Sequence, residues 1–232
     1  MKIAIMQPYL LPYLGYYQLA AQVDHFVFLD DANLIKKGYI NRNTIISNGT
    51  PYKFTIPIIK ASQNKLINEH YFEKDIKKFF KTIEFSYSKS PYYGEVVDLL
   101  KKIFFQENYN VANICSRSIT EVFSYLEKKT TFSFSSEIGS KKKAQNRILE
   151  ICKKLNAKEY YNPIGGRDLY DKSSFKQEGI NLFFFNGEFP EYKHLSKPTV
   201  NSFIPQLSII DVLMSNSKSS IIEMLSMGGK ND

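Results

Sequence analysis

Residues 1–31, MKIAIMQPYLLPYLGYYQLAAQVDHFVFLDD, decide the fold class of this chain. Residues 2–6 form a short apolar run that stops at Gln7-Pro8, which is typical of a buried strand. Residues 13–23 have apolar positions at helical spacing, and residues 25–29 are rich in strand-forming types. A strand, a helix and a second strand in this order predict a parallel β-α-β unit with a right-handed crossover.

The same alternation returns after residue 130. From about residue 73 to residue 130, apolar residues recur every three or four positions, which predicts a helical insert or lid. The remaining strands and helices are predicted at residues 52–58, 132–134, 141–155, 159–161, 180–185 and from 208. We expect a single α/β domain over residues 1–232, built on a Rossmann-like, open, mostly parallel sheet.

Composition places the chain among ordinary globular proteins. Of its 232 residues, 43% are hydrophobic and 23% are charged, which excludes disorder along the whole chain. No run of about 20 apolar residues is present and the first apolar run is too short for a secretory signal, so we expect a cytoplasmic protein without a transmembrane helix. Cys115 and Cys152 are expected to be reduced and buried. The net charge of +8 permits phosphorylated small molecules, RNA or an anionic membrane surface as partners.

In open parallel sheets, ligands bind beyond the carboxyl ends of the strands. The first such end is followed by Gln7, Pro8, Tyr13, Gly15 and Tyr16. Prolines stiffen this turn, Gly15 permits a close approach to the backbone, and a helix start that faces out of a sheet attracts anions. The turn is therefore a candidate substrate or phosphate site. The alternative is a stiff loop that packs its tyrosines.

The second predicted strand ends at two acidic residues. Paired carboxylates at a strand end can hold Mg²⁺ or act as a general base, so Asp30 and Asp31 are the candidate catalytic residues. Substrate or phosphate contacts are predicted for the cations and amides that follow, Lys37, Asn41, Arg42 and Asn43. The alternative is a loop held together by Asp–Arg pairs and amide–backbone hydrogen bonds.

A third candidate site follows the strand predicted at residues 159–161. The pair Gly165-Gly166 and the adjacent Arg167 are suited to cradle a phosphate, although a glycine pair is as often a simple turn. The lysine run at residues 141–143 is expected to be solvated surface. The three histidines have no ligand spacing, so no zinc site is predicted.

Residues 13–16, Tyr-Leu-Gly-Tyr, resemble the His-x-Gly-His element with which nucleotidyltransferase-like proteins grip the phosphates of ATP. Both histidines are replaced by tyrosines, which can hydrogen-bond a phosphate but carry no positive charge at neutral pH. The resemblance implies a nucleotidyltransferase-like variant of the fold, with ATP and Mg²⁺ as cofactors.

Over nearly the whole chain, the sequence resembles the WbqC-like family. The resemblance is carried by the spacing from Phe175 to Ile180 and by three runs: IAIMQPYLLPYLGYYQLAAQVDHFVFLDDANLIKKGYINRNTI at residues 3–45, GSKKKAQNRILEICKKLNAKEYYNP at 139–163 and FIPQLSIIDVLM at 203–214. Membership implies a setting in bacterial gene clusters for O-antigen, capsule and other surface glycans. Enzymes that make deoxy-amino sugars on nucleotide carriers are frequent neighbours there.

That setting implies an enzyme that modifies a nucleotide-linked amino sugar by N-acylation or N-aminoacylation of the sugar amine. The acyl group would come from an ATP-derived adenylate, an acyl-CoA or an aminoacyl-tRNA, and Asp30 or Asp31 would take a proton from the sugar ammonium. Two alternatives stay open. One is a non-catalytic protein that binds nucleotide sugars or scaffolds the pathway. The other is a tRNA- or RNA-binding protein, which the charge permits but no basic–aromatic motif supports.

Overall fold

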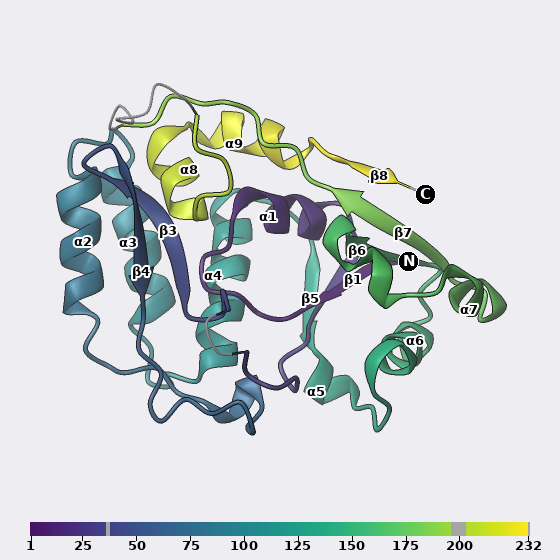
Figure 1. The fold of residues 1–232 in the computed structure, drawn as a ribbon. Helices are drawn as coiled ribbons and strands as arrows, with labels where there is room; N and C mark the ends of the chain where they lie inside the picture. Colours follow the sequence, from purple (N-terminus) through teal and green to yellow (C-terminus); the bar gives the residue numbers. More distant parts are fainter. Residues whose placement is uncertain (36–37, 196–202, 232) are drawn as a thin grey trace.

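The computed structural model describes residues 1–35, 38–195 and 203–231, which form an open α/β fold (Figure 1). Within these ranges, six strands form one sheet in the order β5-β2-β1-β6-β7-β8. Neighbouring strands are parallel, except that β8 runs antiparallel to β7. This confirms the predicted Rossmann-like, mostly parallel sheet. Its strands are β1 (Lys2–Met6), β2 (His25–Phe28), β5 (Thr131–Phe134), β6 (Glu159–Pro163), β7 (Asn181–Asn186) and β8 (Gly229–Asn231).

Helices connect the strands and cover both faces of the sheet (Figure 1). In the described part of the chain, the α-helices are α1 (Leu14–Ala21), α2 (Lys77–Tyr87), α3 (Tyr93–Phe104), α4 (Val111–Tyr125), α5 (Ser135–Ile138), α6 (Ala144–Lys154), α7 (Lys172–Gln177), α8 (Ile209–Ser215) and α9 (Lys218–Leu225). Two 3₁₀ turns accompany them in these ranges, η1 (Ile67–Glu69) and η2 (Ile164–Leu169).

Alternate residues of β1 point to opposite faces of the sheet, as the pleat requires. Ala4 faces a core built with α1, α4, α8 and α9. Ile3 and Ile5 face a second core, built with α6 and α7. Cys115 belongs to the first core and Cys152 to the second, and both are free and buried as predicted. The central strand is therefore buried on both sides, which explains its continuous apolar run.

The stretch from residue 73 to residue 130 is helical, and it contains α2, α3 and α4. Its last helix packs on the first helix of the chain: the hydroxyl of Tyr17 donates a hydrogen bond to the carbonyl of Ser118 at 2.9 Å. The apolar residues of these helices belong to the same core as those of α1. A role as a lid stays a prediction. Among the described residues, no helix is both long and apolar enough to cross a membrane.

The strand predicted at residues 52–58 is β4 (Thr50–Thr55), and it lies outside the main sheet. It pairs antiparallel with β3 (Arg42–Ser47), a strand whose polar first half gives no clear signal in the sequence. The turn between them is Asn48-Gly49, with φ of 50° and 71°. Asn-Gly is the pair that tight hairpins prefer, because both positions need positive φ.

Candidate functional site

The order of the strands creates a switch point between β1 and β6. From β1 the chain moves outward through β2 to β5, and it then returns to place β6 on the other side of β1. The connections after these two neighbouring strands diverge, which leaves a crevice at their carboxyl ends. A cavity of about 190 Å³ lies there. This is the position at which an open α/β sheet binds its ligand.

The cavity is enclosed by segments that are far apart in the sequence. They come from the end of β1, the start of α1, the end of β6 and the chain that follows β7. Of the predicted site residues, Tyr13, Gly15, Tyr16 and Gly165 line it together. Sequence reasoning missed the other half of the wall, which includes Asn186, Gly187, Phe189 and Gln206.

The lining of the cavity is aromatic and neutral. The rings of Tyr13 and Phe189 lie 5.9 Å apart between centroids, and Asn186 and Gln206 add side-chain amides. No charged side chain lines the cavity among the described residues. Aromatic faces beside hydroxyl and amide groups suit a sugar ring or a nucleobase better than a bare phosphate.

Tyr13 lines the cavity and carries a hydroxyl group. Its hydroxyl has no partner among the described residues, although the ring is partly buried. Burial, together with the nearby Tyr9 and Tyr39, raises the pKa of the Tyr13 hydroxyl above its ordinary value. The group therefore stays protonated at neutral pH and can donate to a ligand oxygen.

The turn that presents Tyr13 is held at Leu11, which has φ of 45°. A positive φ is costly for a residue other than glycine, so the surroundings must enforce it. The Leu11 N–H donates to Ser118 Oγ at 2.9 Å, and the Leu11 carbonyl accepts from Asn43 Nδ2 at 2.7 Å and from Ser208 Oγ at 2.8 Å. Three distant segments thus fix the position of the β1–α1 turn.

The predicted residues Gln7, Pro8 and Tyr16 support this turn from inside. Pro8 is buried. Tyr16 is almost fully buried, and its hydroxyl donates to the Gln7 carbonyl at 2.9 Å. Gln7 Oε1 is buried and accepts no hydrogen bond from the described residues. Gly15 is needed for packing, because an added Cβ would lie 2.6 Å from Tyr13 Cε2.

The two glycines after β6 have different surroundings. A Cβ added to Gly166 would overlap the side-chain amide of Asn162, which would have to move to make room. A Cβ added to Gly165 meets no atom within 4 Å. Gly165 lies on the cavity wall, where the absence of a side chain leaves room for a ligand. The guanidinium of Arg167 lies over the ring of Phe184, at 5.4 Å from its centroid.

Asp30 and Asp31 lie at the carboxyl end of β2, beside the start of α5. The buried Asp30 carboxylate accepts hydrogen bonds from Ser136 N–H at 3.0 Å, Ser136 Oγ at 2.6 Å and Asn68 Nδ2 at 2.9 Å. The Ser135 hydroxyl lies against both carboxylates. These contacts favour a role of Asp30 in holding the β2 exit loop on α5, and its catalytic role stays a prediction.

Asp31 forms an ion pair with Arg147 of α6, whose Nη1 also donates to the Asp31 carbonyl at 3.2 Å. The carboxylate oxygens of Asp30 and Asp31 whose contacts are described accept hydrogen bonds from N–H and O–H groups or pair with the Arg147 guanidinium. A carboxylate that binds a metal ion commonly accepts hydrogen bonds from neighbouring groups as well. Mg²⁺ binding at Asp30 and Asp31 therefore stays a prediction.

The stretch after Asp31 is mostly engaged with the backbone. Asn41 Nδ2 donates to the Ile56 carbonyl at 2.9 Å, and Arg42 Nε donates to the Gly38 carbonyl at 2.9 Å. Asn43 holds the Leu11 turn, as described above. Lys37 lies outside the described residues. The amide and guanidinium groups of Asn41, Arg42 and Asn43 already hydrogen-bond to the protein itself. Substrate contacts by these three residues stay a prediction.

The structure is that of an open α/β protein with a cavity at its switch point. The model of the WbqC-like protein family matches residues 7–223, and the chain belongs to this family. The chain is 28% identical over 217 residues to the uncharacterized protein Rv1507c of Mycobacterium tuberculosis, a match that covers 91% of this chain and 92% of that protein. No solved structure gives a significant match.

Proposed function

We propose that this protein modifies a nucleotide-linked amino sugar in the synthesis of a bacterial surface glycan, by N-acylation or N-aminoacylation of the sugar amine. The observation that carries the proposal is the neutral, aromatic and amide-lined cavity between the ends of β1 and β6. The resemblance of the chain to proteins of surface-glycan gene clusters supports the same conclusion. The cytoplasm, where nucleotide sugars are made, is the expected location.

The cavity is large enough for only part of a nucleotide sugar. At about 190 Å³, it is smaller than a typical site for a whole cofactor, so it would take one ring of a nucleotide sugar. The phosphates would lie outside it, against the start of α1, where the helix has no side-chain N-cap. Tyr13 would donate to an oxygen of the bound ring, and Asn186 and Gln206 would bind its other polar atoms.

The proposed reaction forms a C–N amide bond between the sugar nitrogen and the acyl carbon. The bond that breaks joins the same carbon to oxygen in an adenylate or an aminoacyl-tRNA, or to sulfur in an acyl-CoA. The amine loses its proton before or during attack, because only the free amine is nucleophilic. Asp30 or Asp31 would accept that proton, although neither lines the cavity, Asp30 accepts several hydrogen bonds and Asp31 pairs with Arg147.

The test is a mass-spectrometric assay for the acylated sugar. Purified protein is mixed with nucleotide-linked amino sugars and with amino acids plus ATP and Mg²⁺, acyl-CoA or charged tRNA. The expected result is a gain in mass on the sugar, lost when one particular donor is omitted. Product with no donor dependence, or no product despite full folding, would contradict the proposal.

Two glycine variants connect the assay to the cavity. We expect Gly165→Leu to fold normally but to lose sugar binding and turnover, because Gly165 lines the cavity and an added Cβ there meets no protein atom within 4 Å. Gly94→Leu is the matched control: it also adds a leucine where a Cβ meets no atom within 4 Å, but on α3. Equal activity of the two variants would move the ligand away from this cavity.

A non-catalytic nucleotide-sugar binder is the second candidate. It is favoured by the absence of any acidic, basic or thiol side chain from the described lining of the cavity. This candidate predicts that the protein binds the nucleotide sugar, that Gly165→Leu abolishes binding, and that no donor gives a product.

A further inference from the structure

A second hollow lies outside the sheet, between the β3–β4 hairpin and α2. It has a volume of about 770 Å³ and is open to solvent. The hollow forms because Phe54 of β4 packs tightly on Phe79 of α2, with ring centroids 5.2 Å apart, while the hairpin continues beyond this contact to its turn. Tyr52, on the same face of β4 as Phe54, reaches the wall of the gap that remains.

Three lysines of α2 line this hollow. Lys77, Lys78 and Lys81 lie within the first turn and a half of the helix. None of them has an acidic partner among the described residues, whereas lysines elsewhere, such as Lys102 and Lys153, form ion pairs. Unpaired, neighbouring ammonium groups create a positive potential that a polyanion would relieve.

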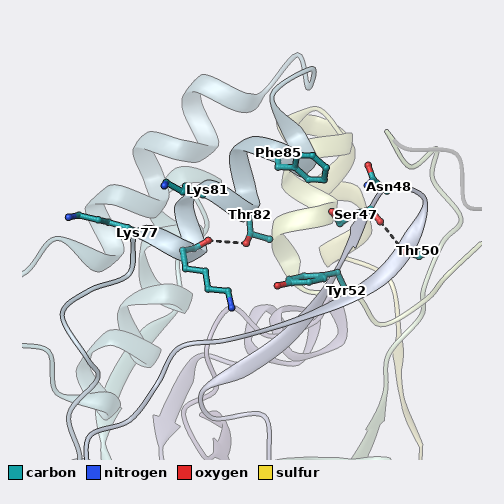
Figure 2. A pocket seen from close by; sticks show the side chains of 9 residues that line it. Ser47, Asn48, Thr50, Tyr52, Lys77, Lys81, Thr82 and Phe85 are labelled. Atoms are coloured by element: carbon teal, nitrogen blue, oxygen red, sulfur yellow. Dashed lines mark hydrogen bonds between the residues drawn. The ribbon is translucent and has the colours of Figure 1, made fainter.

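Two exposed aromatic rings line the same hollow. Figure 2 shows Phe85 and Tyr52 above and below Thr82, while Lys77 and Lys81 extend from the same helix toward the other side. The side chain of Phe85 is 67% exposed and that of Tyr52 is 39% exposed. Lys77, Lys81 and Phe85 follow one another at four-residue spacing, so two charges and then one ring lie along one row of the helix.

The same row of lysines borders another hollow on its other side. Lys77 and Lys81 also line a space of about 900 Å³ between α2 and α3. The stacked rings of Phe80 and Phe105 lie in its wall, 5.4 Å apart, together with Asp75 and Glu84. The lysine row is thus a ridge with aromatic surfaces on both flanks.

We propose that this ridge and its hairpin-side hollow bind a single-stranded segment of nucleic acid. The lysines would contact successive phosphates, and Phe85 and Tyr52 would stack on bases. A sandwiched mononucleotide fits less well, because the hollow is open to solvent rather than closed around one ring. The proposal does not rest on the function assigned to the cavity, which shares no lining residue with this surface.

The test measures binding of a fluorescent twelve-nucleotide oligouridine by anisotropy over a range of salt concentrations. For a single strand, each phosphate contact contributes about 0.7 to the slope of log K against log salt. The triple variant Lys77→Gln/Lys78→Gln/Lys81→Gln should therefore reduce the slope by about two. The control is Lys141→Gln/Lys142→Gln/Lys143→Gln, which removes the same charge from an exposed lysine run elsewhere.

A second variant separates stacking from charge. Phe85→Ala should weaken binding roughly tenfold with an unchanged salt slope, because it removes one stacking surface and no charge. Oligodeoxythymidine should bind similarly, and inorganic polyphosphate should compete poorly. Equal losses in the two lysine variants, or no effect of Phe85→Ala, would show charge attraction alone and overturn the proposal. Failure of the strand to bind wild-type protein at low salt would also overturn it. Thermal unfolding of each variant checks that it is folded.

Discussion

His25 begins β2, and both of its ring nitrogens face hydroxyl groups of the neighbouring strand β5. Nδ1 lies 2.7 Å from Thr131 Oγ1, and Nε2 lies 2.8 Å from Ser133 Oγ. Partial burial lowers the pKa of this ring below its ordinary value of 6.5. The folded protein therefore favours the neutral ring more strongly than the unfolded chain does.

This difference predicts a pH dependence of stability. Near and below pH 6.5 the unfolded chain binds more protons at His25 than the folded protein does, so acid favours unfolding. Stability contributed by the neutral ring is complete above the unfolded pKa and is lost as the pH falls toward the lower, folded pKa. We expect the urea midpoint of the wild type to fall more between pH 7.5 and pH 5.5 than that of His25→Gln, which does not titrate. Parallel pH profiles would contradict the prediction.

The sequence is enough to predict which residues follow the strand ends, but not which other residues their side chains contact. The rule that ligands bind beyond carboxyl ends led to Tyr13 and Gly165, which do line one cavity. The same rule selected Asp30, whose carboxylate is occupied by donors from Asn68 and Ser136. Those partners come from elements whose packing no local pattern in the sequence reveals.

At the scale of elements, the β1–α1 turn depends on the helix α4. Ser118 is fully buried, and its hydroxyl accepts a hydrogen bond from the Leu11 N–H and donates one to the Cys115 carbonyl at 2.7 Å. The sequence gives no sign of this link, because the partners are more than a hundred residues apart. The hairpin turn Asn48-Gly49, by contrast, carries a local signal that predicts β3 and β4 once the pair is recognised.

Ser118→Ala should therefore destabilise the protein. The Leu11 N–H would remain buried without an acceptor, which costs about 1–3 kcal/mol. Ser116→Ala is the matched control on the same helix, because the Ser116 hydroxyl only donates back to the Asn113 carbonyl at 2.9 Å. Urea unfolding should show a clear loss for the first variant and a much smaller one for the second. The prediction fails if both midpoints shift equally.

At the scale of the whole molecule, Asp211 joins three regions. This fully buried carboxylate accepts hydrogen bonds from Tyr87 of α2 at 2.6 Å, from Tyr192 at 2.9 Å and from His194 Nδ1 at 2.8 Å. Burial, and then the charge of Asp211, raises the pKa of Tyr87 well above its ordinary value. The phenol therefore remains a donor, and α2, α8 and the chain after β7 are held at one point.

Asp211→Ala should be among the most damaging single changes in this protein. It leaves three donors without their acceptor, two of them buried, and breaking a buried charged contact costs about 3–5 kcal/mol. Tyr192→Phe removes one donor and leaves two others on the carboxylate, so its cost should be about 1.5–3 kcal/mol. Urea unfolding measures the free energy of unfolding of both variants. A smaller loss of stability for Asp211→Ala than for Tyr192→Phe would contradict this account.

The central position of β1 has a consequence for synthesis of the protein. Its first partner, β2, follows it closely in the chain, but its second partner, β6, is separated from it by all of α2 through α6. During translation, the backbone N–H and C=O groups on one edge of β1 have no strand partner until residues 159–163 have left the ribosome. Premature termination before β6 would thus release an incomplete sheet that is prone to aggregate rather than a smaller functional protein. The nascent chain should depend on chaperones for most of its synthesis.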